Sequence, residues 1–448
     1  MLAPEQKPVA RPFLAVAQSF SSGAQTPRQF LEQSLALLDS WEPRIGAFVC
    51  TNLPDARAAA DRSTARWRAG KPLSPIDGMP VGIKDIIETV DMTTEMGSPL
   101  FAGWRSEKDA ACVRALRDSG AVIIGKTVTT EFAASQPRGT RNPWNLAHTP
   151  GGSSSGSAAS VAAGIVTAAL GTQVISSVVR PASFCGVVGF KPSVNALNRE
   201  GSHDYQSQSC TGILGASLED VWQVAHEIVS QVGGDAGTPG LQGPDKLPAA
   251  KKPRAIAMLE TAGWQSGDAE AKRRLEDCVA RLKSAGIDIR TRHNDKTVAA
   301  LEAELPSVTE LSHRINGWEG RWFFRCMRDR DINKMGPITR ERVDKYEDVT
   351  LERHRADLKE RLRIRAVYAE LASVCDACIT LAAPGAAPEG LGSTGNPEFG
   401  VPSSLLGVPS LSLPLFELDG MPLGLQVIGY FDRDADAFAI ASWLMQPR

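Results

Sequence analysis

The densest group of side chains that could do chemistry is a run of glycines and serines between Thr149 and Gly164, TPGGSSSGSAASVAAG. A Gly-rich turn that leads directly into a helix presents backbone N–H groups and the positive end of the helix dipole, which suit an anion or a reaction oxyanion. Gly/Ser density is also typical of a flexible linker. A linker would not run straight into an Ala/Val helix, so the run indicates a binding or catalytic site.

Two common motifs do not account for this run. It lacks the GK[ST] ending of a phosphate-binding P-loop and the strand–turn–helix setting of a GxSxG nucleophile elbow. The chain has six histidines, and His148 is the one close to the run. The residues alone leave a Ser–His arrangement open, although nothing marks a particular histidine as the base.

Other blocks accompany the Gly/Ser core in a fixed order. They are Gly78–Ile87 (GMPVGIKDII), Gly125–Ala133 (GKTVTTEFA), Pro150–Ser157 (PGGSSSGS), Arg180–Pro192 (RPASFCGVVGFKP), and the C-terminal pair Gly407–Pro414 and Met421–Gly429. With these blocks the chain resembles the amidase signature family of serine hydrolases over nearly its whole length. The resemblance implies one large α/β domain, whose central, mixed, twisted sheet is covered by helices on both faces and carries a mostly helical insertion.

The resemblance also implies a Ser–cisSer–Lys triad, which the order of the blocks places on Lys84, Ser153 and Ser177. A serine hydroxyl is a poor nucleophile until a base takes its proton, and a lysine can be that base only when it is neutral. Burial beside uncharged hydroxyls lowers the pKa of a lysine toward the working range. We expect Ser153 to relay the proton and the Gly152–Ser153 bond to be cis. Ser154 and Ser155 are rival relays, and Ser155 is expected in a turn or helix cap.

The nucleophile loop, GTQVISSVVR from Gly171 to Arg180, departs from the family pattern GTDTGGS or GTQTAGS. The backbone N–H groups of Val174, Ile175, Ser176 and Ser177 are the expected oxyanion hole. Ile175 would resist the positive φ that a glycine permits. The loop is therefore held at ordinary φ, or moves on binding, or belongs to a weakened enzyme. Ser176 is also a rival nucleophile.

The substrate is less clear from the sequence. By the resemblance, the expected substrate contacts are Met96, Gly97, Trp318, Trp322 and Phe323. The cluster Trp318, Trp322, Phe323, Phe324 and Met327 contains i,i+4 pairs, so packing in a helix core is the simpler interpretation. A substrate-facing cluster would favour an aromatic or alkyl group.

The chain looks most like the bacterial amidases reported as urethanases, so we expect an amidase or urethanase that cleaves amides and carbamates through an acyl-enzyme. Two alternatives stay open: a glutaminase-type subunit of a tRNA-dependent amidotransferase, and a catalytically weakened protein on the same fold. The chemistry needs no metal and no cofactor. The expected partners are a small amide, carbamate or ester substrate and water, with neither nucleic acid nor membrane, and the chain is expected to be a monomer or homodimer.

Alternating helices and strands should position these residues. Capping patterns and apolar spacing predict helices over 27–40, 54–70, 157–163, 268–285 and from Ser217 onward. Short apolar runs predict strands over 120–125, 165–170, 254–260, 287–291, 409–414 and 423–430. We expect the domain to span 1–448, with its core over 1–231 and 375–448 and a variable, substrate-shaping region over 254–372.

The composition fits this interpretation. Lys and Arg number 49 against 51 Asp and Glu, a net charge of −2, which argues against non-specific nucleic-acid binding. The N-terminal residues lack the apolar stretch of a signal peptide, so a cytoplasmic location is expected. The eight cysteines are too sparse for a disulfide scaffold, and Cys375 and Cys378 are expected as buried thiols at a helix-to-strand junction.

Overall fold

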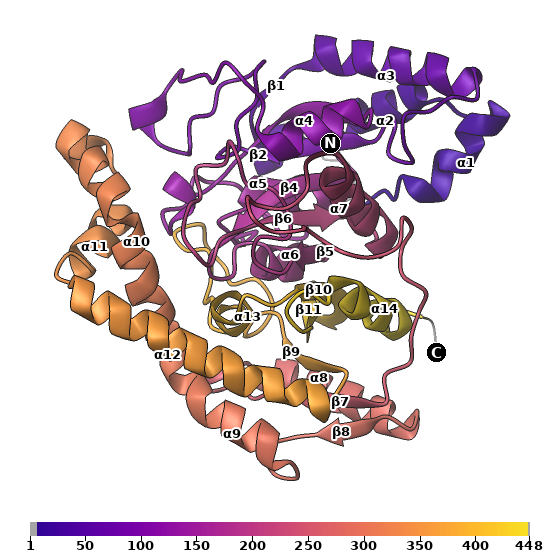
Figure 1. The fold of residues 1–448 in the computed structure, drawn as a ribbon. Helices are drawn as coiled ribbons and strands as arrows, with labels where there is room; N and C mark the ends of the chain where they lie inside the picture. Colours follow the sequence, from indigo (N-terminus) through magenta and orange to yellow (C-terminus); the bar gives the residue numbers. More distant parts are fainter. Residues whose placement is uncertain (1–6, 447–448) are drawn as a thin grey trace.

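A single mixed sheet runs through the molecule in the computed structural model, which describes residues 7–446 (Figure 1). Its eleven strands among these residues follow the order β1-β3-β2-β4-β6-β5-β10-β11-β9-β7-β8. The strand bounds are β1 Phe48–Thr51, β2 Pro80–Lys84, β3 Val122–Thr127, β4 Ala168–Gln173, β5 Val188–Lys191, β6 Cys210–Gly215, β7 Ala255–Met258, β8 Asp288–Arg290, β9 Ala377–Leu381, β10 Ser410–Leu418 and β11 Met421–Ile428. The predicted α/β fold class is confirmed.

The strand directions decide where the catalytic candidates meet. β2 runs parallel to β3 on one side and to β4 on the other. The carboxyl ends of these three strands therefore lie at one edge of the sheet, and Lys84 is the last residue of β2. The remaining pairs are antiparallel, apart from β7 with β8 and β9.

Helices cover both faces of the sheet. The helix bounds are α1 Leu14–Ser22, α2 Pro27–Ile45, α3 Leu53–Arg68, α4 Ala111–Asp118, α5 Ser155–Ala162, α6 Val179–Cys185, α7 Leu218–Val232, α8 Ala269–Ser284, α9 Lys296–Glu304, α10 Val308–Asp331, α11 Pro337–Lys345, α12 Leu351–Glu370, α13 Val401–Leu406 and α14 Asp434–Leu444. Alternate residues of β4 enter opposite cores, since Ala168 and Leu170 pack with α4 and α7 whereas Ala169 packs with α2, α3 and α5. A third core joins α9, α10, α12 and α13.

Capping and hydrophobic patterns in the sequence predicted most of these helices and strands, but some of the predicted first and last residues are wrong. Thr26 and Gln29 form the expected capping box of α2. The helix runs to Ile45, beyond the predicted residue 40, because Trp41 and Ile45 continue its buried face. The predicted strand at 165–170 is wrong by three residues: Ile165 N–H donates to the Ser160 carbonyl in the turn that ends α5, so β4 starts only at Ala168.

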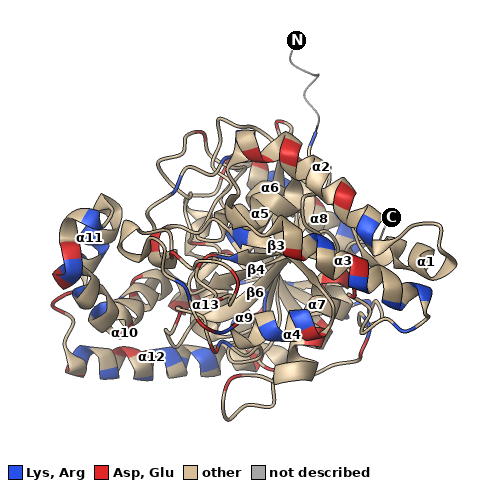
Figure 2. Cartoon of the chain, turned by 90° about the horizontal axis from the view of Figure 1, so that it is seen from above, with Lys and Arg blue, Asp and Glu red and all other residues tan. Residues whose placement is uncertain are grey.

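The segment from α9 to α12 lies beside the sheet as an arm of helices (Figure 1). Blue Lys and Arg residues are spread along α12 in Figure 2. The division into a core and a variable region stays a prediction, and residues 1–6 and 447–448 of the expected domain lie outside the described residues. Within residues 7–446, a bilayer could not be crossed by any helix, since none combines the necessary length and apolarity.

Candidate active site

Lys84 ends β2 with a completely buried side chain. Its Nζ lies 2.8 Å from Ser153 Oγ and 2.8 Å from Thr172 Oγ1, and 3.4 Å from the Thr172 carbonyl. No carboxylate among residues 7–446 forms an ion pair with this amine. Burial lowers the pKa of Lys84 to about 7, and the negative charge of Asp204 opposes the shift. A buried amine surrounded by hydroxyls can therefore be neutral near neutral pH.

The three consecutive serines have three different partners. Ser153 Oγ contacts Lys84, and the Gly152–Ser153 peptide bond is cis. Ser154 Oγ bonds to the Thr172 carbonyl, and Ser155 Oγ donates to the Val128 carbonyl. Ser155 is the first residue of α5 rather than its cap. Ser154 is the N-cap residue, but its side chain accepts no hydrogen bond from the N–H groups of the helix. The geometry thus leaves Ser153 as the serine in contact with the lysine.

The nucleophile loop is fixed by side chains on both sides. The Gln173 Oε1 atom accepts from the N–H groups of Val178 and Val179 at 2.9 and 3.0 Å, where α6 begins. Ser404 Oγ donates to the Ile175 carbonyl at 2.8 Å and accepts from Gln173 Nε2 at 3.0 Å. These bonds hold the loop between β4 and α13.

Backbone geometry in this loop is ordinary. Positive φ values occur at six non-glycine residues of the described chain, and none of them lies between 174 and 177. The backbone N–H groups of these four residues donate to no acceptor within residues 7–446. Free N–H groups beside a cavity are what an oxyanion hole requires. Of the three expectations for the loop, the structure shows the one with ordinary φ.

Ser176 and Ser177 face different surroundings. Ser176 Oγ is buried without a hydrogen-bond partner, and its side chain packs so closely on Gly400 that a methyl group there would collide with it. Ser177 is partly exposed and lines a cavity, with its carbonyl accepting from Ser154 N–H at 3.3 Å. Its hydroxyl makes no hydrogen bond within the described chain. Ser177 is therefore the accessible hydroxyl of the two.

Arg180 links the Gly/Ser run to the helix α6 that follows the nucleophile loop. Its guanidinium donates to the Gly152 carbonyl at 2.6 Å, to Thr394 Oγ1 at 3.0 Å and to the Gly395 carbonyl at 2.8 Å. Burial lowers the pKa of Arg180 to about 9. Arg180 of α6 therefore holds Gly152, the residue before Ser153, in place.

A cavity of about 230 Å³ opens beside Ser177, near the small end of the range for small-molecule sites. One part of its wall is apolar and aromatic, with Phe132, Phe323, Phe324, Ile338, Val174 and Ile175. The other part is polar, with Arg180, His203, Asp204, His313, Glu319 and Arg342. The cavity therefore lies between the sheet and the helical arm.

The aromatic part of the wall is built on strained backbone. Phe132 has φ 51° and Ala133 has φ 54°, values that bulky residues rarely adopt. The Phe132 ring contacts Phe323 and Phe324 edge to face, with centroids 5.3 and 6.1 Å apart. This contact joins the body of the molecule to α10.

Only one of the five expected substrate contacts, Phe323, lines the cavity. Met96 and Gly97 lie behind its wall, where the Met96 carbonyl accepts from Phe132 N–H. Trp318 stacks on His354 and carries the Arg321 guanidinium over its ring, and Trp322 is 75% exposed. Helix-core packing is wrong for Trp322, but Phe323, Phe324 and Met327 do pack against the main core.

The sequence profile of the amidase family matches residues 29–437. The chain belongs to the amidase family. It is 31% identical to a glutamyl-tRNA(Gln) amidotransferase subunit of Anaeromyxobacter sp. (strain K), over 92% of this chain and 91% of that protein. A solved structure described as "Crystal structure of amidase" matches with a TM-score of 0.82 and 27% identity, over 97% of this chain and 99% of that one. The native peptide amidase from Stenotrophomonas maltophilia shares the fold, with a TM-score of 0.74 and 24% identity over 96% and 95% of the two chains.

This amidase contains site residues that sequence reasoning missed. Thr172, which binds Lys84, precedes Gln173 in the loop block, and Arg180 follows Ser177 by three residues, so both stood beside recognised positions. Nothing local marked Asp204 or Arg342. His148 bonds to the Ala387 carbonyl and does not line the cavity. Within the described chain no group of three or more His, Cys, Asp or Glu residues is arranged to hold a metal ion.

Proposed function

We propose that this amidase hydrolyses C–N bonds through Lys84, Ser153 and Ser177. The observation that supports the proposal most directly is the Lys84 amine, which is buried, free of carboxylate partners and 2.8 Å from Ser153 Oγ. A lysine in that setting can lose its proton and act as a base. Its neighbours would hold it in either protonation state, since hydroxyl groups both donate and accept.

The proposed reaction begins when the Ser177 hydroxyl turns toward Ser153, since the two hydroxyls share no hydrogen bond in the structure. Ser177 passes its proton to Ser153 while Ser153 passes its own to Lys84 Nζ. The Ser177 oxygen attacks the substrate carbonyl, and the oxyanion forms beside the N–H groups of residues 174–177. The protons then return through Ser153 to the leaving nitrogen. Water hydrolyses the ester on Ser177 by the same relay.

We further propose that the substrates are amides and carbamates that carry an aromatic or alkyl group. The rings of Phe132, Phe323 and Phe324 offer such a group an apolar wall beside the nucleophile loop. Burial of an aromatic ring against these side chains would stabilise binding. The carbamate preference depends on the likeness to urethanase-type amidases.

A second function has its own support. The relative at 31% identity is named as part of a glutamyl-tRNA(Gln) amidotransferase. A chain with that role would release ammonia from glutamine and work with other subunits. The apolar cavity wall favours the first proposal.

The isolated chain decides between these functions. We expect it to release 4-nitroaniline from simple acyl anilides, and an amine or alcohol from aryl carbamates, with no partner present. Ammonia release from glutamine alone, or only after amidotransferase subunits are added, would support the second function. If the unaltered protein and its Ser177→Ala variant were equally inactive on all substrates, the weakened-enzyme interpretation would hold.

A further inference from the structure

The peptide unit between Ile175 and Ser176 is held from behind the cavity wall. Its carbonyl oxygen accepts from Ser404 Oγ at 2.8 Å and, in a longer contact of 3.4 Å, from Gln173 Nε2. Ser404 lies on α13 with a completely buried side chain, and it is not one of the residues that line the cavity. The oxygen of this peptide unit is therefore directed toward α13.

This contact fixes the direction of the Ser176 N–H group. A trans peptide unit is planar, so its C=O and N–H bonds point to opposite sides. Within residues 7–446 the cis peptide bond is Gly152–Ser153, so the unit between Ile175 and Ser176 is trans. On the side away from α13, the Ser176 N–H group meets no acceptor of the described chain. Because both residues line the cavity, the N–H group is presented to it.

The direction of the Ser404 hydroxyl is set in turn by Gln173. The Gln173 Oε1 atom accepts from the N–H groups of Val178 and Val179, so its Nε2 atom faces Ser404. Nε2 donates to Ser404 Oγ at 3.0 Å. Because the hydroxyl oxygen accepts this bond, its own hydrogen is available to the Ile175 carbonyl. A chain of hydrogen bonds thus runs from the start of α6 to the nucleophile loop.

The other half of the peptide unit is seated on the same helix. The buried Ser176 side chain packs on Gly400, which precedes α13, so closely that a methyl group on that glycine would collide with it. The family pattern GTDTGGS has glycines where this chain has Ile175 and Ser176. A glycine backbone turns freely. In this chain, contacts with α13 fix the same part of the loop.

We propose that Ser404 is a positioning residue for the oxyanion hole, because it holds the Ile175 carbonyl on α13 and so directs the Ser176 N–H group at the oxyanion. The inference rests on the proposed function, since it concerns the same reaction. Without the Ser404 hydroxyl the peptide unit can turn, and the negative end of the carbonyl dipole would then approach the oxyanion. Such a change weakens binding of the transition state more than binding of the substrate.

The first test separates kcat from KM for an uncharged acyl anilide. In Ser404→Ala we expect kcat to fall by about 10- to 100-fold, with KM within about twofold of the unaltered value. Ser404→Cys keeps a weaker donor and should lie between the two proteins. Ser403→Ala is the matched control: Ser403 is equally buried on α13, but its hydroxyl donates to the Gly400 carbonyl at 3.1 Å. This variant should keep the unaltered kcat.

A pair of ketones measures the oxyanion contact without turnover. With a trifluoromethyl ketone the Ser177 oxygen bonds to the carbonyl carbon, the serine proton passes through Ser153 to Lys84, and the carbonyl oxygen becomes an oxyanion. The methyl ketone with the same phenethyl group binds without this addition. In Ser404→Ala we expect the preference for the trifluoromethyl ketone to fall by about 10- to 100-fold, as kcat does. Calorimetric titration measures both affinities.

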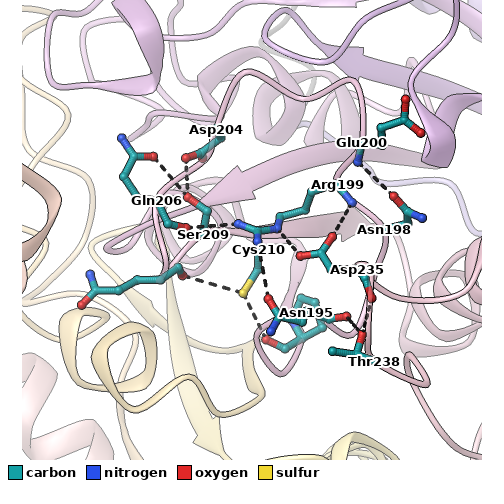
Figure 3. A network of polar contacts seen from close by, with 12 residues as sticks. Asn195, Asn198, Arg199, Glu200, Asp204, Gln206, Ser209, Cys210, Asp235 and Thr238 are labelled. Atoms are coloured by element: carbon teal, nitrogen blue, oxygen red, sulfur yellow. Dashed lines mark hydrogen bonds and ion pairs between the residues drawn. The ribbon is translucent and has the colours of Figure 1, made fainter. Parts of the chain in front are cut away.

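The pH dependence separates Ser404 from the groups that act on Lys84. Asp204, whose negative charge raises the pKa of Lys84, accepts from the Ser209 hydroxyl. Figure 3 shows this bond within a network of polar contacts in the loop before β6. Ser404 takes no part in that network. The pH at which kcat/KM reaches half its maximum should therefore be the same in Ser404→Ala and the unaltered protein.

Any of four results would overturn the inference: an unchanged kcat in Ser404→Ala, an equal loss of kcat in Ser403→Ala, an unchanged preference between the ketones, or a shifted pH midpoint. A crystal structure of the unaltered protein with the trifluoromethyl ketone needs no variant. It should show Ser176 N bonded to the oxyanion and the Ile175 carbonyl on Ser404, and a carbonyl that points into the cavity would also overturn the inference. If the unaltered protein neither hydrolyses the anilide nor adds the ketone, the proposed function fails, and this inference with it.

Discussion

Two buried lysines stand on neighbouring strands, and their surroundings differ in one respect. Lys126 Nζ on β3 lies 3.1 Å from Asp85 Oδ1, with both side chains fully buried. Lys84 on β2 is equally buried, but within residues 7–446 its amine hydrogen-bonds only to Ser153 and Thr172. Asp85 directly follows Lys84 in the chain, yet its carboxylate forms an ion pair with Lys126. Burial lowers the pKa of both amines, and at Lys126 the carboxylate opposes this effect.

The difference shows how one fold can use buried lysines for two purposes. The ion pair with Asp85 favours the charged form of Lys126, and removing either member would leave a buried charge alone. Hydroxyl neighbours allow Lys84 to exist without its proton, which is what a base needs. The predictions below test this contrast.

The largest effect should come from Lys84→Met. We expect kcat/KM for an uncharged acyl anilide to fall by about 10³-fold or more, because Lys84 is the one group of the described chain that hydrogen-bonds to Ser153 Oγ. The chain should still fold, since the change removes a buried amine without leaving a charge. Nitroaniline release and circular dichroism measure the two properties. Full turnover in the folded variant would refute the mechanism.

A matched pair of variants should identify which serine is the nucleophile. Ser177→Ala should lose about 10³-fold in kcat/KM, whereas Ser176→Ala should stay within about tenfold, because the Ser176 hydroxyl faces Gly400. A sulfonyl fluoride should modify Ser177, and peptide mapping would locate the adduct. An adduct on Ser176 would reverse the assignment.

Lys126→Met should act on stability. The change leaves Asp85 buried without its cation, so we expect the free energy of unfolding to fall by about 3–5 kcal/mol. Urea denaturation measures the loss. The double variant Lys126→Met, Asp85→Asn should recover part of it, because no buried charge remains. Equal stability of the single variant and the unaltered protein would show that the ion pair contributes nothing.

The smallest effect is the pH dependence of the unaltered protein. With a pKa of about 7, Lys84 loses its proton as pH rises through 7, so kcat/KM should increase about tenfold per unit below pH 7 and level off above it. Asp204→Asn should move this limb to lower pH, since the negative charge of Asp204 raises the pKa of Lys84. A rate that peaked below pH 6 would contradict a lysine base.

The contrast between the lysines could not be seen in the sequence. What the sequence did show was local. The motif blocks resembled those of a known family. Thr26 and Ser217 marked the starts of two helices, because a cap depends on a residue only three positions along the chain. Trp318 and Trp322 looked equally suited to a substrate site. The fold turned one toward His354 and the other toward solvent, and it brought Phe132 into the wall instead.

The sequence by itself determined the family, the α/β class and the order of the catalytic blocks, since these depend on local patterns and on resemblance. Only the tertiary structure decided which serine touches Lys84, which lysine receives Asp85, and that Arg342 shares a cavity with Ser177. These neighbours are far apart along the chain. Their contacts depend on the parallel order of β2, β3 and β4 and on the arm packing against Phe132, and neither leaves a periodic signal in the sequence.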